Sequence, residues 1–184
     1  MNYHYISIPK EGEEYSGDGI FIHEKRPFTR FITVDSLGHG ERAEKVIDEV
    51  RKVNDRLGDA PPSKIINFLH RVLRGTRGAA ISIADFYENR LYWCGVGNVD
   101  MRCTNKNINP VNISGIVGYK VRKTKTFDYN FQEEDIFIIH TDGISSRFSL
   151  DDLPKQKSAE EIAEYVMKNH RKPMDDSTVL VVKI

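Results

Sequence analysis

The sequence lacks the features that mark secreted, membrane-spanning and nucleic-acid-binding proteins. It has two cysteines, and Cys94 and Cys103 have neither the spacing of a metal site nor the number needed for a disulfide framework. No apolar run approaches the roughly 20 residues that span a bilayer, and the opening MNYHYISIPKEGEE does not have the pattern of a signal peptide. Lys and Arg number 27, as do Asp and Glu, so the net charge is zero. We therefore expect a cytoplasmic protein with reduced thiols and with no membrane or nucleic-acid partner.

The composition is that of a globular protein with an ordinary core. Hydrophobic residues make up 39% of the chain and charged residues 29%, which is normal for a folded protein and too apolar for a disordered one. A length of 184 residues suits one domain, and we find no internal repeat or linker-like tract. We therefore expect residues 1–184 to form a single domain, with no separate sensor or membrane domain.

Hydrophobic periodicity predicts three helices and a larger number of strands. The clearest helix spans 41–57, and others are expected over 63–73 and over 158–169, where Ser158 and Glu161 form a capping box. Expected strands span 3–8, 19–23, 30–34, 79–86, 90–94, 98–104, 135–140 and 179–184, and residues 121–128 alternate weakly. The strands come in consecutive runs, which indicates an α+β fold with helices covering largely antiparallel sheets.

Aspartates lie beside small residues at the edges of four apolar runs. Asp35 and Asp142 directly follow expected strands, in VDSLGHG and HTDG, whereas Asp18 and the pair Asp175–Asp176 precede strands. Neighbouring strands of an antiparallel sheet run in opposite directions, so strand starts and strand ends can meet at one rim. The pattern therefore predicts that these carboxylates gather into one site.

A cluster of carboxylates needs a cation or raised pKa values, because like charges a few ångströms apart repel each other. Oxygen-only ligands suit Mg²⁺ or Mn²⁺ better than zinc. Two such ions roughly 3.5–4 Å apart can stabilise in-line attack on a phosphoryl group. Aspartates next to glycine also form ordinary turns, which would explain any one of the four positions taken singly.

Several motifs together give the chain a family resemblance. They are SGDG (16–19), VDSLGHG (34–40), RGAAISI (77–83), YWCGVGNV (92–99), ISG (113–115), FIIHTDGI (137–144) and DDSTVLV (175–181). In this set and order the sequence resembles the metal-dependent PPM-type serine/threonine protein phosphatases of the bacterial SpoIIE/RsbU/RsbX branch, and its short length is most like the RsbX group. The resemblance implies an α-β-β-α sandwich of two largely antiparallel sheets flanked by helices.

The resemblance also implies roles for individual residues. Asp35 would bridge two Mn²⁺ or Mg²⁺ ions, and the main-chain carbonyl of Ser36 would support the second ion. Asp142 and Asp175 would complete the site of the first ion. A hydroxide held between the ions would attack the phosphorus of phosphoserine or phosphothreonine, which makes Asp35, Asp142 and Asp175 the expected catalytic residues.

Other implied roles are less sharply defined. Asp18 would lie near the ions as a ligand or through water, and Asp176 would support its neighbour, although either aspartate of the pair 175–176 could be the direct ligand. The resemblance further implies a monomeric enzyme that acts on phosphorylated regulatory proteins, stressosome RsbR- and RsbS-type proteins, in a bacterial stress response.

Ser36 departs from the family pattern, which has glycine at this position. If the main chain there needs a positive φ, serine costs about 1 kcal/mol or more and weakens the second ion's site. This departure motivates an alternative, a pseudophosphatase that binds a phosphorylated partner without turnover. A third interpretation, a two-metal nuclease, fits the carboxylates but lacks a basic groove.

Four further features are open to more than one interpretation. His39 is a candidate acid for the leaving serine oxygen, and His140 a weaker one because strand parity can turn it away. Gly95 and Gly97 are expected to form a tight corner, with Asn98 bonding the backbone. The segment 113–125 has four basic residues, which favours either a solvated edge or a flap that docks a phosphoprotein. The pattern identifies no arginine as a phosphate clamp.

Overall fold

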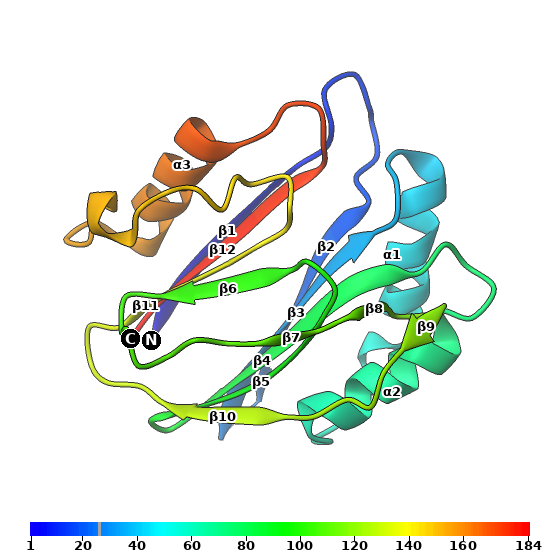
Figure 1. Ribbon diagram of the computed structural model, residues 1–184, viewed down its shortest axis with the longest axis horizontal. Helices are drawn as coiled ribbons and strands as arrows, with labels where there is room; N and C mark the ends of the chain where they lie inside the picture. The colour runs from blue at the N-terminus through cyan, green and yellow to red at the C-terminus, as the bar shows by residue number, and fades with distance from the viewer. Residues whose placement is uncertain (26) are drawn as a thin grey trace.

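The computed structural model describes residues 1–25 and 27–184 and has four layers, helix, sheet, sheet and helix (Figure 1). The strands are β1 (Asn2–Ile8), β2 (Asp18–Lys25), β3 (Phe28–Ser36), β4 (Ala79–Tyr87), β5 (Arg90–Val96), β6 (Asp100–Cys103), β7 (Asn112–Ile113), β8 (Gly115–Ile116), β9 (Lys120–Val121), β10 (Phe127–Asn130), β11 (Ile136–His140) and β12 (Ser177–Lys183). The helices are α1 (Glu41–Asn54), α2 (Pro62–Val72), α3 (Ala159–His170) and a short 3₁₀ helix at Leu150–Asp152.

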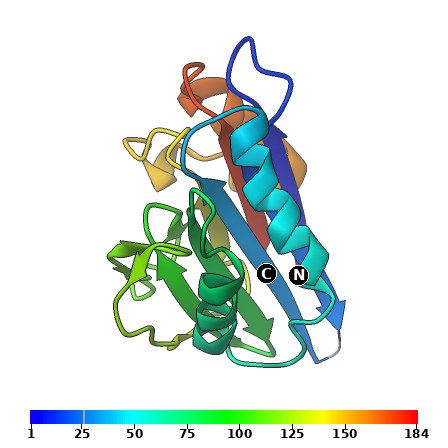
Figure 2. The same ribbon diagram turned by 90° about the vertical axis from the view of Figure 1, so that its right-hand side faces the viewer.

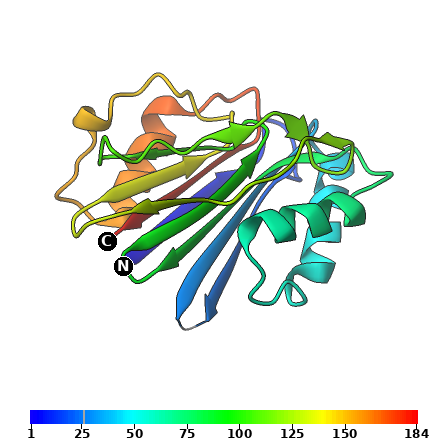
Figure 3. The same ribbon diagram turned by 60° about the horizontal axis from the view of Figure 1, so that its bottom comes forward.

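Two sheets form the middle layers. One has the strand order β1-β12-β11-β6, and the other has the order β10-β5-β4-β3-β2 with β7 added beside β5. Every pairing is antiparallel except that of β5 with β7. Figure 3 shows the two sheets lying between α3 on one side and α1 with α2 on the other, and Figure 2 looks onto the side of α1 and α2. The expected α+β fold and α-β-β-α sandwich are therefore confirmed.

Alternation along the strands creates three separate cores. In β3, Phe31 faces the other sheet and packs in the cluster that contains Trp93 and Phe137, whereas its neighbour Ile32 packs against α1 and α2. A third cluster joins α3 to β11 and β12. Since the side-chain period of a strand is two, Asp35 follows the parity of Phe31 and lies at the end of the space between the sheets.

The three helices form where the periodicity predicts them. α1 buries Ala43, Val46, Ile47 and Val50, and it ends three residues before the expected Leu57, which is nevertheless buried. α3 has the expected capping box, with reciprocal bonds between Ser158 and Glu161. No helix in the described part of the chain is long and apolar enough to cross a bilayer.

The expected strands were wrong in two places. No strand was expected over 105–118, but this segment contains β7 and β8, and the weak strand expected over 121–128 is divided between β9 and β10. These strands are two to four residues long, and each exists because a partner strand supplies its hydrogen bonds. Strands this short do not produce a hydrophobic periodicity from which they could be predicted.

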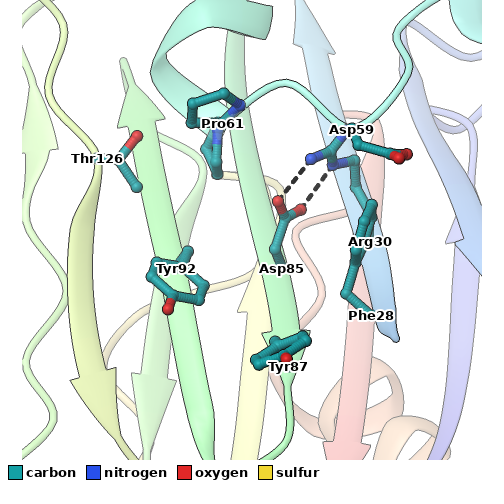
Figure 4. Close-up of a pocket in the computed structure, with 9 residues that line it drawn as sticks. Phe28, Arg30, Asp59, Pro61, Asp85, Tyr87, Tyr92 and Thr126 are labelled. Carbon is teal, nitrogen blue, oxygen red and sulfur yellow. Dashed lines mark hydrogen bonds and ion pairs between the residues drawn. The ribbon is translucent and has the colours of Figure 1, made fainter. Parts of the chain in front are cut away.

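A buried ion pair connects β3 and β4 to the turn before α2. Figure 4 shows Asp85 of β4 pointing toward Arg30 of β3, whose Nε and Nη2 atoms each donate to a carboxylate oxygen over 2.6 Å. The same guanidinium donates to the carbonyls of Gly58 and Ala60 at 2.8 Å. Burial raises the pKa of Asp85, and Arg30 opposes that rise. Arg30 thus fixes the turn that positions α2 on the sheet.

Replacing Arg30 by methionine should lower the free energy of unfolding at neutral pH by about 3–5 kcal/mol, because it leaves a buried carboxylate unpaired. The pKa of Asp85 would then rise further in the folded state, so the loss should shrink as the pH falls toward that pKa. Urea denaturation near neutral pH and at acid pH measures both effects. The double variant R30M/D85L should recover most of the loss, and wild-type stability in R30M alone would contradict this role.

Candidate metal centre

The first two aspartates meet directly in the sheet. The antiparallel register of β2 and β3 pairs Asp18, at the start of one strand, with Asp35, near the end of the other. Asp142 follows β11, and Asp175 precedes β12, its neighbour in the second sheet. Thr141 joins the sheets at this rim, because its hydroxyl donates to Asp18 at 2.7 Å and accepts from the Thr178 amide at 3.0 Å. The predicted meeting of strand starts and strand ends therefore occurs.

Asp35, Ser36, Asp142 and Asp175 line one pocket of about 150 Å³. Its remaining walls are Leu37, Gly38, Ala80, Gly97, Asn98, Gly115 and Ile116. Three carboxylates from both sheets, together with the residue after Asp35, thus open into the same small volume.

Gly97 forms the expected tight corner beside this pocket. Its φ is 89°, and an added Cβ would lie 2.5 Å from the Cβ of Ala80, so only glycine fits without a shift. Asn98 does not bond the backbone as expected: its Nδ2 donates to Oδ2 of Asp142 over 2.6 Å. Asn98 therefore orients a carboxylate of the site, a role that the sequence pattern did not reveal.

The adjacent aspartates 175 and 176 have different surroundings. Asp176 is 4% exposed, and its two oxygens accept hydrogen bonds from the backbone amides of Lys10 and Gly17, both at 2.8 Å. Asp175 is only partly buried and faces the pocket. Asp175 is therefore available to a metal ion, whereas Asp176 holds the loop before β2 against the loop before β12.

Ser36 has an unstrained backbone. It is the last residue of β3 and pairs with Ala79 of β4, and among the described non-glycine residues only Glu88 and Glu134 have a positive φ. Its amide donates to the carbonyl of Gly17 at 2.9 Å. The conformational cost considered for serine at this position therefore does not arise, although the buried Ser36 hydroxyl has no hydrogen-bond partner among the described residues.

Burial and mutual repulsion raise the pKa values of the clustered carboxyls. The pKa of Asp35 rises from 3.8 to about 9, first through burial and then through the charges of Asp18, Asp142, Asp175 and Asp176. The pKa of Asp18 rises to about 7, mainly through burial, against the hydrogen bonds from threonines 141 and 178. Without a cation, Asp35 therefore holds a proton at neutral pH.

The donor set fits a hard divalent cation. All of the acidic donors in the pocket are carboxylate oxygens, which Mg²⁺ and Mn²⁺ prefer, and a bound cation would remove the repulsion that raises the pKa of Asp35. Within residues 1–25 and 27–184, no three His, Cys, Asp or Glu side chains already converge closely enough to chelate one ion. Binding therefore requires the carboxylates to draw together around the ion.

Two cationic side chains flank the pocket. Arg77 lies against Gly38 and donates from Nη1 to the carbonyl of Leu37 at 3.3 Å. Lys172 donates from Nζ to the main-chain carbonyl of Asp142 at 2.5 Å. The sequence pattern did not identify Arg77 as a candidate phosphate-binding residue. Arg77 is 42 positions from Asp35, and the pairing of β3 with β4 brings it close to the pocket.

Neither candidate histidine lines the pocket. His39 is exposed, with Nδ1 at 2.7 Å from Glu13 Oε1 and Nε2 at 3.0 Å from Lys10 Nζ. His140 is 1% exposed, its Nδ1 lies 3.0 Å from the carbonyl oxygen of Thr141, and burial lowers its pKa. The geometry does not support the expectation that His39 protonates a leaving group.

Comparison with known proteins identifies relatives of the same overall structure. No protein-family model matches the sequence. The chain is 27% identical over 179 residues to the phosphoserine phosphatase RsbX of Bacillus subtilis, covering 95% of this chain and 90% of that protein. A crystal structure of RsbX in complex with magnesium superposes with a TM-score of 0.86 at 26% identity, covering 97% and 92% of the two chains. The PP2C phosphatase domain of SpoIIE from Bacillus subtilis has the same fold, with a TM-score of 0.76 at 18% identity over 100% and 63%.

The metal-free protein should lose stability as the pH rises. Asp35 has a higher pKa in the folded state than in the unfolded state, so the folded state binds more protons between about pH 4 and pH 9 and becomes less stable across that window. Asp35→Asn should flatten this dependence and raise the melting temperature near pH 8, by about 2–4 °C for each kcal/mol of repulsion relieved. Thermal melts in EDTA measure this. The matched change at the exposed Asp152 should have no effect, and a melting temperature that rises with pH would contradict the assignment.

Alanine substitutions at positions 175 and 176 should affect different properties, metal binding in the first case and folding stability in the second. Asp176→Ala removes two hydrogen bonds from buried amides to a carboxylate and should cost about 3 kcal/mol of unfolding free energy. Asp175→Ala should leave the metal-free protein at least as stable as the wild type, because it removes one of the repelling charges, but it should remove the rise in melting temperature that Mn²⁺ produces. Each variant is the control for the other. The same effects with the two residues exchanged would make Asp176 the ligand.

Proposed function

We propose that this chain is a bacterial PPM-type phosphatase similar to RsbX, and that it removes phosphate from phosphoserine and phosphothreonine of a partner regulatory protein with the help of divalent metal ions. The observation that carries the proposal is the pocket lined by Asp35, Asp142 and Asp175, carboxylates brought together from three distant parts of the sequence. A protein that bound no cation would be destabilised by this cluster, because the carboxylates repel one another. The cluster therefore indicates a site for a cation.

The ions bound by this pocket are Mn²⁺ or Mg²⁺, and we propose two of them. When bound, such ions stabilise the charge of the transferring phosphoryl group and lower the pKa of a water nucleophile. Asp35 is central among the ligands because it is the carboxylate whose pKa responds to all four of the others. Asp142 and Asp175 complete the set, and the main-chain oxygen of Ser36 and the carboxylate of Asp18 assist.

Residues around the carboxylates hold this arrangement in place. Asn98 keeps one oxygen of Asp142 hydrogen-bonded, and Thr141 keeps Asp18 oriented toward the rim. Asp176, bound to two backbone amides, supports the loop that carries Asp175. Arg77 adds a positive charge beside Leu37 and Gly38, two residues of the pocket wall, where it can attract a phosphate dianion.

We propose that the substrates are phosphorylated stressosome proteins of the RsbR and RsbS type and that the enzyme acts as a cytoplasmic monomer. Support comes from the similarity to RsbX and from the fold shared with a structure from a study of the bacterial stressosome, at a TM-score of 0.90 and 24% identity. The pseudophosphatase alternative loses its motivation, because Ser36 has a regular strand conformation.

Phosphate release from a phosphoserine protein should depend on Mn²⁺ or Mg²⁺ and should stop in excess EDTA. Asp35→Asn and Asp142→Asn should each lower kcat/KM at least about 100-fold, the scale of losing one group that stabilises developing charge. Malachite-green detection of phosphate measures the rate. Asp152→Asn provides the matched control, and full activity in EDTA would refute the proposal.

A further inference from the structure

We propose that the β8–β9 hairpin and the connection between α2 and β4 form a docking surface for acidic residues that flank the phosphoserine of the substrate protein. This inference rests on the proposed phosphatase function and specifies the chemistry of its substrate. The surface, called the basic surface below, consists of Arg74, Arg77, Lys120 and Arg122.

The basic surface begins at the metal pocket. Gly115 and Ile116 of β8 line the pocket of Asp35, and the same two residues line a second hollow of about 260 Å³ whose other walls include Tyr119, Lys120 and Arg122. The two hollows are therefore neighbours, with Gly115 and Ile116 of β8 between them. A chain whose phosphoserine enters the first hollow would place its neighbouring residues in the second.

Backbone contacts hold the hairpin against the α2–β4 connection. The amide and carbonyl of Val117 pair with those of Ala79, at 2.8 and 3.0 Å, and the Gly118 amide donates to Nδ1 of His70 at 3.0 Å. Gly78 has a φ of 79°, and an added Cβ would lie 2.7 Å from the Val117 carbonyl oxygen, so the two segments are in close contact. Figure 1 shows β8 and β9 beside α2.

Charge is strongly segregated in these two segments, although the whole chain is neutral. Residues 60–84 contain no Asp or Glu, and neither do residues 101–127. Lys120, Arg122, Arg74 and Arg77 are all exposed, and within the described part of the chain none of them forms an ion pair with a carboxylate. Elsewhere on the protein, surface lysines and arginines pair repeatedly, as Lys45 does with Glu41.

The chemistry of this surface selects an acidic partner. Unpaired cations next to a pocket for a phosphate dianion attract a negatively charged segment and orient it before the phosphoserine enters. Tyr119 is 78% exposed and adds an aromatic contact between the charges, of the type that anchors protein interfaces. The hydrogen-bonded hairpin is preformed, so little ordering is needed when the partner binds.

The test compares two phosphoserine peptides that differ only in having Asp or Ala at the flanking positions, with p-nitrophenyl phosphate as a substrate that has no flanks. The wild-type enzyme with Mn²⁺ should prefer the acidic peptide about tenfold in kcat/KM, and this preference should decline as NaCl is raised. The charge-reversed variant K120E/R122E should lose the preference and keep its rate on p-nitrophenyl phosphate within about twofold. The variant K106E/K168E, which changes two exposed lysines outside the basic surface, is the matched control.

Binding is measured in parallel by fluorescence anisotropy of the same two peptides, so that the result does not depend on turnover. Equal affinity of the wild-type protein for both peptides, or equal losses in K120E/R122E and K106E/K168E, would overturn the docking surface. No hydrolysis of the peptides or of p-nitrophenyl phosphate would overturn the proposed phosphatase function instead. In that case a retained preference for binding the acidic peptide would still support the docking surface.

Discussion

Repulsion among buried carboxylates is the constraint on which the rest of this structure depends. Asp18 and Asp35 face each other across two paired strands, and Asp142 and Asp175 approach them from the second sheet. In the absence of a cation, protonation of Asp35 relieves part of this repulsion, and the remaining free energy that holds the cluster together comes from elsewhere. The interleaved core between the sheets, with Phe31, Trp93 and Phe137 fully buried, is the main source. The protein is thus less stable than its core permits, in exchange for an affinity for cations.

Burial divides the acidic residues into two groups. Asp18 and Asp176 have hydroxyl or amide donors and are buried, so they hold the loops and sheets in register. Asp35, Asp142 and Asp175 face the pocket. The same side chain therefore serves as structural support at one position and as a metal donor at the next. What distinguishes the two groups is whether the carboxylate opens into the pocket, because Asp142 and Asp175 also accept hydrogen bonds, from Asn98 and from the Asp176 amide.

The structure also separates charge in space. Carboxylates fill the pocket, while unpaired cations occupy the adjacent hairpin and the connection before β4. A phosphoprotein carries both a dianionic phosphate and its flanking residues, so a site that holds metal ions and a neighbouring basic surface match different parts of one substrate. The net charge of zero conceals this arrangement, because opposite charges cancel in a sum and not at a surface.

The sequence by itself determined the α+β class, the three helices and the candidate acidic residues, because hydrophobic periodicity and strand-end aspartates are local signals. The α-β-β-α layers were implied by the resemblance to a known family. Only the tertiary structure decided the rest. Asp175 rather than Asp176 faces the pocket, since the amides of Lys10 and Gly17 come from a distant loop. Ser36 is unstrained because of its pairing with Ala79, Asn98 bonds Asp142, and β7 to β9 depend on partner strands. Each of these depends on contacts between distant segments, which a local pattern does not contain.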